Sequence, residues 1–318
     1  MNRQDRRRRI AEISKDANAG APFVNDMRVA ADLHRQGRLK EAENAYRAII
    51  RIYAAVPEIR VAWSNLGAVL QGLGKLEEAV TALKKARSLN PNHPPPHQNL
   101  GMALLAQGKV DEALESFRRA VELNPQFTEA WHALGVASGQ KNDLAGAEDA
   151  WRRTLELDPN RAETRFNLGL ILRNTGRLDA AAAEFHACAT LDPSQGDARL
   201  ALADTLIAMG RAEEAAQIIW VLIQTTPAHP VPQQFYARAL TVMAQMGNGD
   251  AAADRADQWA AAYPDSEAAR SVKIAFDNYR AEKAAAENTA AETRAEEAPA
   301  IEAAAEPAVE KKPEAPEA

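Results

Sequence analysis

The sequence predicts an all-α solenoid, a stack of helix–turn–helix hairpins, on three observations. Prolines recur every 34 residues, small residues keep the same register between them, and aromatic residues, which favour strands, make up only 5% of the chain. A period of this length over five copies is typical of repeat proteins whose units bury their apolar faces against their neighbours. The prolines that set the period are Pro91, Pro125, Pro159, Pro193 and Pro227.

Each period is expected to hold two helices, as residues 60–93 illustrate. Gly67 lies in the first helix, and Gly74 supplies the left-handed backbone conformation that ends it. Gly67 and Ala79 present small surfaces that let the two helices approach closely, and a larger residue four positions after the alanine fills the gap beside the neighbouring hairpin. Pro91 cannot continue the second helix, so the unit ends there.

Two stretches resemble the tetratricopeptide repeat (TPR) family, whose 34-residue units carry W-x2-L-G and later Ala, an aromatic residue and Pro. Residues 62–91 read AWSNLGAVLQGLGKLEEAVTALKKARSLNP, with Trp63, and residues 130–159 read AWHALGVASGQKNDLAGAEDAWRRTLELDP, with Trp131. The resemblance implies a right-handed superhelix of about seven hairpins, in which the first helix of each hairpin, helix A, lines a concave groove.

The expected organisation has four parts. A basic arm (1–22) precedes the solenoid (23–264), which is followed by a capping helix (265–285) and a disordered acidic tail rich in Ala, Glu and Pro (286–318). The units are expected at about 23–59, 60–93, 94–127, 128–161, 162–195, 196–229 and, in degenerate form, 230–264.

Charge is concentrated at the two ends of the chain. The formal net charge is −6, and residues 282–318 alone hold ten Glu against four Lys or Arg. Residues 1–22 hold six Lys or Arg against three Asp or Glu, so the chain between is close to neutral, which argues against a nucleic-acid channel through the solenoid. The first residues lack the apolar core of a secretory signal, and no apolar run is long enough to span a membrane. A cytoplasmic location is therefore expected.

No pattern of an enzyme, cofactor or metal site is recognisable, so we expect a non-catalytic protein without a cofactor. His93 and His97 lie four residues apart, but three prolines at a helix start separate them and no third ligand lies nearby. The single cysteine, Cys188, occupies a position that holds a small core residue in other units, which predicts a buried, unreactive thiol.

The groove holds the candidate binding residues. The resemblance implies that positions 2, 5, 6, 9, 12 and 13 of each unit face it, and position 6 reads Asn65, Asn99, Ala133 and Asn167. Asparagine both donates and accepts hydrogen bonds, so a ladder of asparagines can pair with the backbone of an extended peptide. The ladder is similar to that in the TPR region of the O-linked GlcNAc transferase family, although asparagine is frequent here in TPRs and can simply bind water. The flanking candidates are Ser64, Gln71, Gln98, His132, Gln140, Arg173 and Asn174, with Phe166 as an apolar contact.

The sequence thus predicts a scaffold or adaptor that binds a peptide or partner segment in the groove. The groove lacks the lysines and arginines with which chaperone-tail-binding TPRs hold a terminal carboxylate, so that activity is excluded. Two alternatives remain open. One is an accessory subunit that presents substrates to a separate enzyme, such as a glycosyltransferase. The other is an assembly factor that meets an anionic membrane or nucleic acid through Arg6, Arg7, Arg8 and Arg9, which otherwise form a solvated arm.

Overall fold

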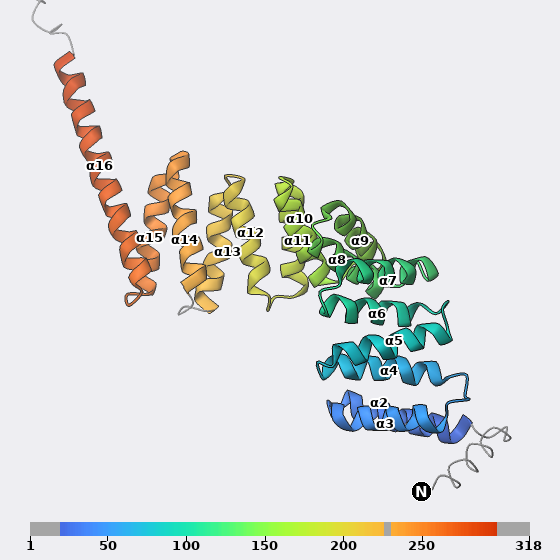
Figure 1. Cartoon of the computed structure of the whole chain (residues 1–318). Helices are drawn as coiled ribbons and strands as arrows, with labels where there is room; N and C mark the ends of the chain where they lie inside the picture. The colour runs from blue at the N-terminus through green and yellow to red at the C-terminus, as the bar shows by residue number, and fades with distance from the viewer. Residues whose placement is uncertain (1–19, 226–229, 298–318) are drawn as a thin grey trace, which may run out of the picture. The chain divides into compact units, whose positions relative to one another are not determined.

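The computed structural model describes residues 20–225 and 230–297, which form helices and the turns between them (Figure 1). By their contacts, the residues divide into two compact units between Thr205 and Leu206, whereas the sequence predicted one solenoid. The basic arm up to residue 19, residues 226–229 and the tail beyond residue 297 lie outside the described residues, so the predictions made for them stay predictions.

Unit 1, up to Thr205, is a series of antiparallel hairpins in which even-numbered helices are helices A and odd-numbered helices are helices B. The helices are α2 (Gly20–Arg35), α3 (Leu39–Ile52), α4 (Ile59–Gly72), α5 (Leu76–Leu89), α6 (Pro94–Ala106), α7 (Val110–Leu123), α8 (Thr128–Gln140), α9 (Leu144–Leu157), α10 (Ala162–Asn174), α11 (Leu178–Leu191) and the first ten residues of α12 (Gly196–Ala208).

The turns between helices A and B repeat one geometry. Gly74 has φ of 72°, its N–H donates to Gln71 O, and the next N–H, of Lys75, donates to Leu70 O, each at 2.9 Å. This is the glycine C-cap expected from the sequence. Asn142 takes the same place after α8 with φ of 62° and is the one non-glycine residue with positive φ among those described.

A glycine in each helix A receives the large side chain of its own helix B. A Cβ built on Gly101 would lie 2.5 Å from Phe117 Cε1, and one built on Gly169 would lie 2.7 Å from Phe185 Cε1. Gly67 faces Leu83 and Gly135 faces Trp151 in the same way. The large residue therefore packs on the glycine of its own hairpin, a more specific contact than the filling of a gap predicted from the sequence.

Unit 2, from Leu206, contains four further helices joined in part by a π-helical segment, η1 (Ala244–Asn248). Its core gathers aromatic rings: Tyr236 lies 5.5 Å from Trp220 and 5.2 Å from Trp259 between ring centroids. The helices are α13 (Ala212–Thr225), α14 (Pro230–Met243), α15 (Gly249–Ala262) and α16 (Glu267–Glu297).

The last helix is longer than expected. We predicted a capping helix ending at residue 285, but α16 continues to Glu297. Its first half is held on α15, because Arg280 binds Asp257 at 2.6 Å and Asp254 at 2.7 Å. Beyond that the sequence is rich in alanine and glutamate, both strong helix formers, and this propensity extends the helix past its support.

Candidate functional site

Polar pairs join consecutive helices A of unit 1. Each pair runs from one hairpin to the next, so together they hold the row of helices A at a fixed spacing. Two of the pairs include residues expected to bind a peptide on both sides or one side of the contact. The pairs are Asn99 Nδ2 to Ser64 Oγ (3.1 Å), His132 Nδ1 with Thr164 Oγ1 (2.8 Å) and Arg173 Nη1 with Asp204 Oδ2 (3.2 Å).

Two amides of the predicted asparagine ladder are oriented by neighbouring hydroxyls. Asn65 Nδ2 donates to Tyr46 Oη at 3.2 Å, and Tyr46 is fully buried. Asn99 Nδ2 donates to Ser64 Oγ. In these two contacts each amide uses one N–H, and its carbonyl oxygen and second N–H are the groups that a peptide backbone could pair with. Asn167, the third member, is half-buried on α10.

His132 lies inside the row instead of lining an open groove. Its residue is 8% exposed, Nδ1 meets Thr164 Oγ1, and Nε2 lies 3.5 Å from Glu163 Oε1. Burial lowers the pKa of His132, and the nearby Arg161 lowers it further, against the opposing effect of Glu163. The ring is therefore neutral at pH 7 and serves as a link between α8 and α10.

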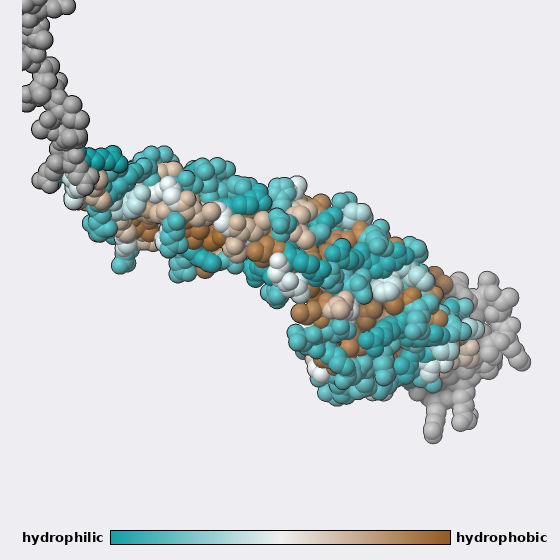
Figure 2. Space-filling view, turned by 90° about the horizontal axis from the view of Figure 1, so that it is seen from above, coloured by the Kyte–Doolittle hydropathy of each residue, from teal (hydrophilic) through white to brown (hydrophobic). Residues whose placement is uncertain are grey.

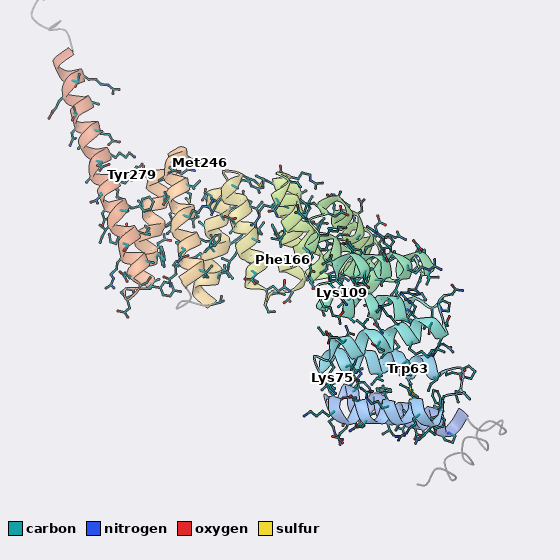
Figure 3. The ribbon with its side chains drawn as sticks, in the orientation of Figure 1. Trp63, Lys75, Lys109, Phe166, Met246 and Tyr279 are labelled. Atoms are coloured by element: carbon teal, nitrogen blue, oxygen red, sulfur yellow. The ribbon has the colours of Figure 1, made fainter. Side chains whose placement is uncertain are left out.

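The two candidates on α10 both contact Phe185. The rings of Phe166 (labelled in Figure 3) and Phe185 lie 5.7 Å apart at 57°, and the Arg173 guanidinium lies 5.9 Å from the centre of the Phe185 ring. Arg173 is also paired with Asp204, so its charge is neutralised within the protein. Of the other candidates, Ser64 is buried, Gln71 and Gln98 are half-buried, and Gln140 and Asn174 are exposed at the last positions of α8 and α10.

Sequence reasoning missed the apolar part of this face. Met102 lies three residues after Asn99 on α6, and Val61 lies four residues before Asn65 on α4, so each shares a helix face with its asparagine. Met102 is 42% exposed and Val61 is 39% exposed. The space-filling view shows such hydrophobic residues interrupting the hydrophilic surface (Figure 2). The signal was in the sequence, because Val136 and Leu170 follow Met102 at intervals of 34 residues, and both are half-buried.

We name the inner face from these residues: the exposed or half-buried positions of α4, α6, α8 and α10 around the asparagine ladder. Its members are Val61, Asn65, Gln71, Gln98, Asn99, Met102, Val136, Gln140, Phe166, Asn167, Leu170 and Asn174.

The histidine pair at the start of α6 is explained by the repeat. His97 is buried and its Nε2 lies 2.8 Å from Pro91 O, the carbonyl of the proline that ends the preceding unit. Trp131 Nε1 donates to Pro125 O at 3.0 Å in the equivalent place. His93 is exposed, and within the described ranges no group of three or more His, Cys, Asp or Glu could hold a metal ion.

Cys188 has the environment expected for an unreactive thiol. It is fully buried on α11, and its Sγ–H donates to Gln195 Oε1 at 3.3 Å. Burial and, to a lesser degree, the charge of Asp192 raise the pKa of the thiol, so the nucleophilic thiolate is disfavoured. Within residues 20–225 and 230–297, no helix has the combined length and hydrophobicity that crossing a bilayer requires.

Repeated hairpins with a glycine under each large helix B residue define a helical-repeat protein. Three family models, each described as a tetratricopeptide repeat, match residues 24–90, residues 134–195, and residues 70–138 with 172–239, so their ranges run unbroken from 24 to 239 of 318 residues. The chain belongs to the tetratricopeptide repeat family. No curated protein matches it by sequence.

Solved structures share the fold. PilW, a type IV pilus biogenesis factor, is 19% identical with a TM-score of 0.58 over 67% of this chain and 98% of its own. A tetratricopeptide repeat protein from Parabacteroides merdae is 19% identical with a TM-score of 0.53 over 80% and 98%. YrrB, described as a TPR protein with an unusual peptide-binding site, is 24% identical with a TM-score of 0.52 over 60% and 96%.

Proposed function

We propose that the protein is a non-catalytic scaffold that binds an extended peptide or partner segment along the inner face. The observation that carries the proposal is the oriented pair of amides, Asn65 and Asn99, each beside an exposed apolar side chain, Val61 or Met102. An extended backbone offers alternating donors and acceptors to the amides and side chains to the apolar positions, and this combination gives both affinity and some selectivity.

The affinity is expected to be modest. The amides are already held by hydroxyls, so little of their freedom is lost on binding, but the peptide itself must be ordered. A dissociation constant of about 1 μM, or about −8 kcal/mol, is typical when ordering the ligand consumes much of the contact energy.

The test is selection of peptides from a random display library on the full chain, followed by affinity measurement with the enriched peptides. We expect the triple variant Asn65→Ala, Asn99→Ala, Asn167→Ala to bind them at least about tenfold more weakly, because three paired amides are lost. The matched control replaces exposed asparagines away from the inner face, Asn44→Ala, Asn92→Ala and Asn160→Ala, and should bind as the wild type does.

Stability is separated from binding by a second variant. Val61→Glu with Met102→Glu changes side chains that are already exposed, so it should keep the fold and still weaken binding. If peptides bind the asparagine triple variant, the glutamate variant and the wild type equally well, the inner face is not the binding site.

A further inference from the structure

The second position of successive helices A changes from apolar to acidic along unit 1. All of these residues lie in the first turn of their helix, and the three carboxylates are exposed. From α4 to α12 the row reads Val61, Pro95, Glu129, Glu163 and Asp197. We call these five residues the edge row. It borders the inner face, because Glu129 and Glu163 lie four residues before the ladder positions of α8 and α10.

The negative charge of the edge row is not neutralised by ion pairs. Neither Glu129 nor Asp197 has an ion-pair partner among the described residues. Glu163 lies 3.5 Å from the neutral ring of His132, with Arg161 the cation nearest to that ring by its effect. The amino end of each helix favours one carboxylate, which accounts for acidic residues there but leaves α4 and α6 without any.

The segment that precedes α2 has the complementary pattern. Read backward from Gly20, it presents Ile13, Ile10 and then the four consecutive arginines at positions 6–9. The edge row, read away from α2, presents two apolar residues and then three acids. Helices A all run in the same direction because hairpins alternate, so the amino end of α2 lies at the edge of the row to which these first turns belong.

The length of the segment matches the row. Consecutive helices A contact one another, and packed helices lie about 10 Å apart, so α4 to α12 lie about 10 to 50 Å from α2. An extended chain advances about 3.3 Å per residue. Ile13 can thus reach about 23 Å and Ile10 about 33 Å, over α6 and α8, whereas positions 9 to 6 reach about 36 to 46 Å, over the acidic helices.

We propose that residues 1–19 bind in extended form along the edge row of their own chain, with the arginines at Glu129, Glu163 and Asp197, and partly cover the inner face. The proposal rests on the proposed function for its consequence, since the bound segment then competes with a partner peptide. Docking itself is independent of any partner. It is an electrostatic contact between exposed groups, so salt weakens it.

The test places a photo-crosslinking residue in the segment of the full chain, as Ile10→p-benzoylphenylalanine, and maps the crosslinks by mass spectrometry without any partner. Crosslinks within one chain to residues 94–140, α6 to α8, are expected. Their yield should fall at least fivefold in Glu129→Gln, Glu163→Gln, Asp197→Asn. The matched control on helices B, Glu112→Gln, Glu115→Gln, Asp149→Asn, removes the same charge from exposed positions and should leave the yield unchanged.

Crosslinks that join two chains, fall on the acidic tail, or persist in the edge-row variant overturn the proposal. A second measurement uses the full chain with the arginines at 6–9 changed to glutamine and the peptides selected on the inner face. Release of a competing segment should tighten their binding several-fold. Equal binding with no crosslink to α6–α8 rejects the docked segment and leaves the scaffold function standing, whereas loss of peptide binding to the inner-face variants tests only the scaffold.

Discussion

Glu148 on α9 accepts hydrogen bonds from both terminal nitrogens of Arg177 in the next hairpin, at 2.8 and 2.6 Å. Arg152, one turn along α9, binds the same carboxylate at 2.9 Å. Arg177 first, and then Arg152, lower the pKa of Glu148 to about 2, against a burial effect in the other direction. The junction between the first two hairpins repeats the arrangement, with Glu43 bound to Lys75 at 2.8 Å.

The first prediction concerns this junction. Glu148→Gln should lower the free energy of unfolding by about 1 kcal/mol, because the amide cannot form charge-assisted bonds with two guanidinium groups. Urea denaturation followed by circular dichroism measures the change. Glu115→Gln, at an exposed site on α7, should change it by less than about 0.5 kcal/mol, and equal losses in both variants would contradict the role of Glu148.

The same pair gives a pH dependence. The folded-state pKa of Glu148 is below its ordinary value of 4.5, so its contribution to stability is fully present above about pH 5. It is lost as the pH falls from 4.5 through about 2, where the folded state also binds the proton. The stability difference between the wild type and Glu148→Gln should therefore be constant from pH 7 to 5 and shrink below that. A difference that grows on acidification would contradict the assignment.

The contact between Gly135 and Trp151 predicts a large effect of one methyl group. A Cβ at Gly135 would lie 2.5 Å from Trp151 Cδ1, and the fully packed ring cannot move away cheaply. Gly135→Ala should cost about 1–3 kcal/mol, as overpacking does. Gly139→Ala on the same helix is the matched control, since its Cβ would lie 3.6 Å from Trp151 Cη2. That change should be neutral or stabilise by up to about 1 kcal/mol, as measured by thermal melting.

The turn after α8 is the one with room for improvement. Asn142 adopts φ of 62°, which costs an L-residue energy that glycine does not pay. Asn142→Gly should raise the melting temperature, with a gain of up to about 1 kcal/mol, whereas Asn142→Ala should lower it. Calorimetry of both variants decides the matter, because an alanine variant as stable as the glycine variant would mean that the turn changes its conformation.

The hydrogen bond between Asn65 and Tyr46 gives a prediction that guards the binding test. Asn65→Ala leaves the buried Tyr46 hydroxyl without this partner and should destabilise the protein by about 1–2 kcal/mol. Adding Tyr46→Phe removes the stranded hydroxyl and should recover most of the loss. A double-mutant cycle by urea denaturation measures the coupling, and purely additive losses would show that the bond contributes nothing.

Much of the fold could be predicted because its determinants are local and periodic. Gly74 announces a helix end by its own backbone preference, and Pro91 announces a unit end by the N–H it lacks. The length of α16 was missed for the opposite reason. A boundary drawn where large apolar residues cease ignores the alanine and glutamate that continue a helix without a core to pack on.

The candidate site was harder to predict because it depends on distances between helices. His132 has the same position in its unit as Ser64, yet it reaches Thr164 of the following helix and becomes buried. Arg173 likewise meets Asp204, which no pattern within one unit reveals. Met102 was within reach of sequence reasoning, but the search followed polar residues and passed over the apolar residue beside each amide.

Because each large helix B residue closes onto the glycine of its own hairpin, a hairpin carries most of its packing instructions within 34 residues. A gene for such a chain can therefore grow or shrink by duplication or loss of whole units without redesign of the remainder. Each such event would lengthen or shorten the ligand that the protein measures by about 10 Å, or three residues of extended chain. The glycines thus act as the graduations of a ruler whose length evolution can adjust one mark at a time.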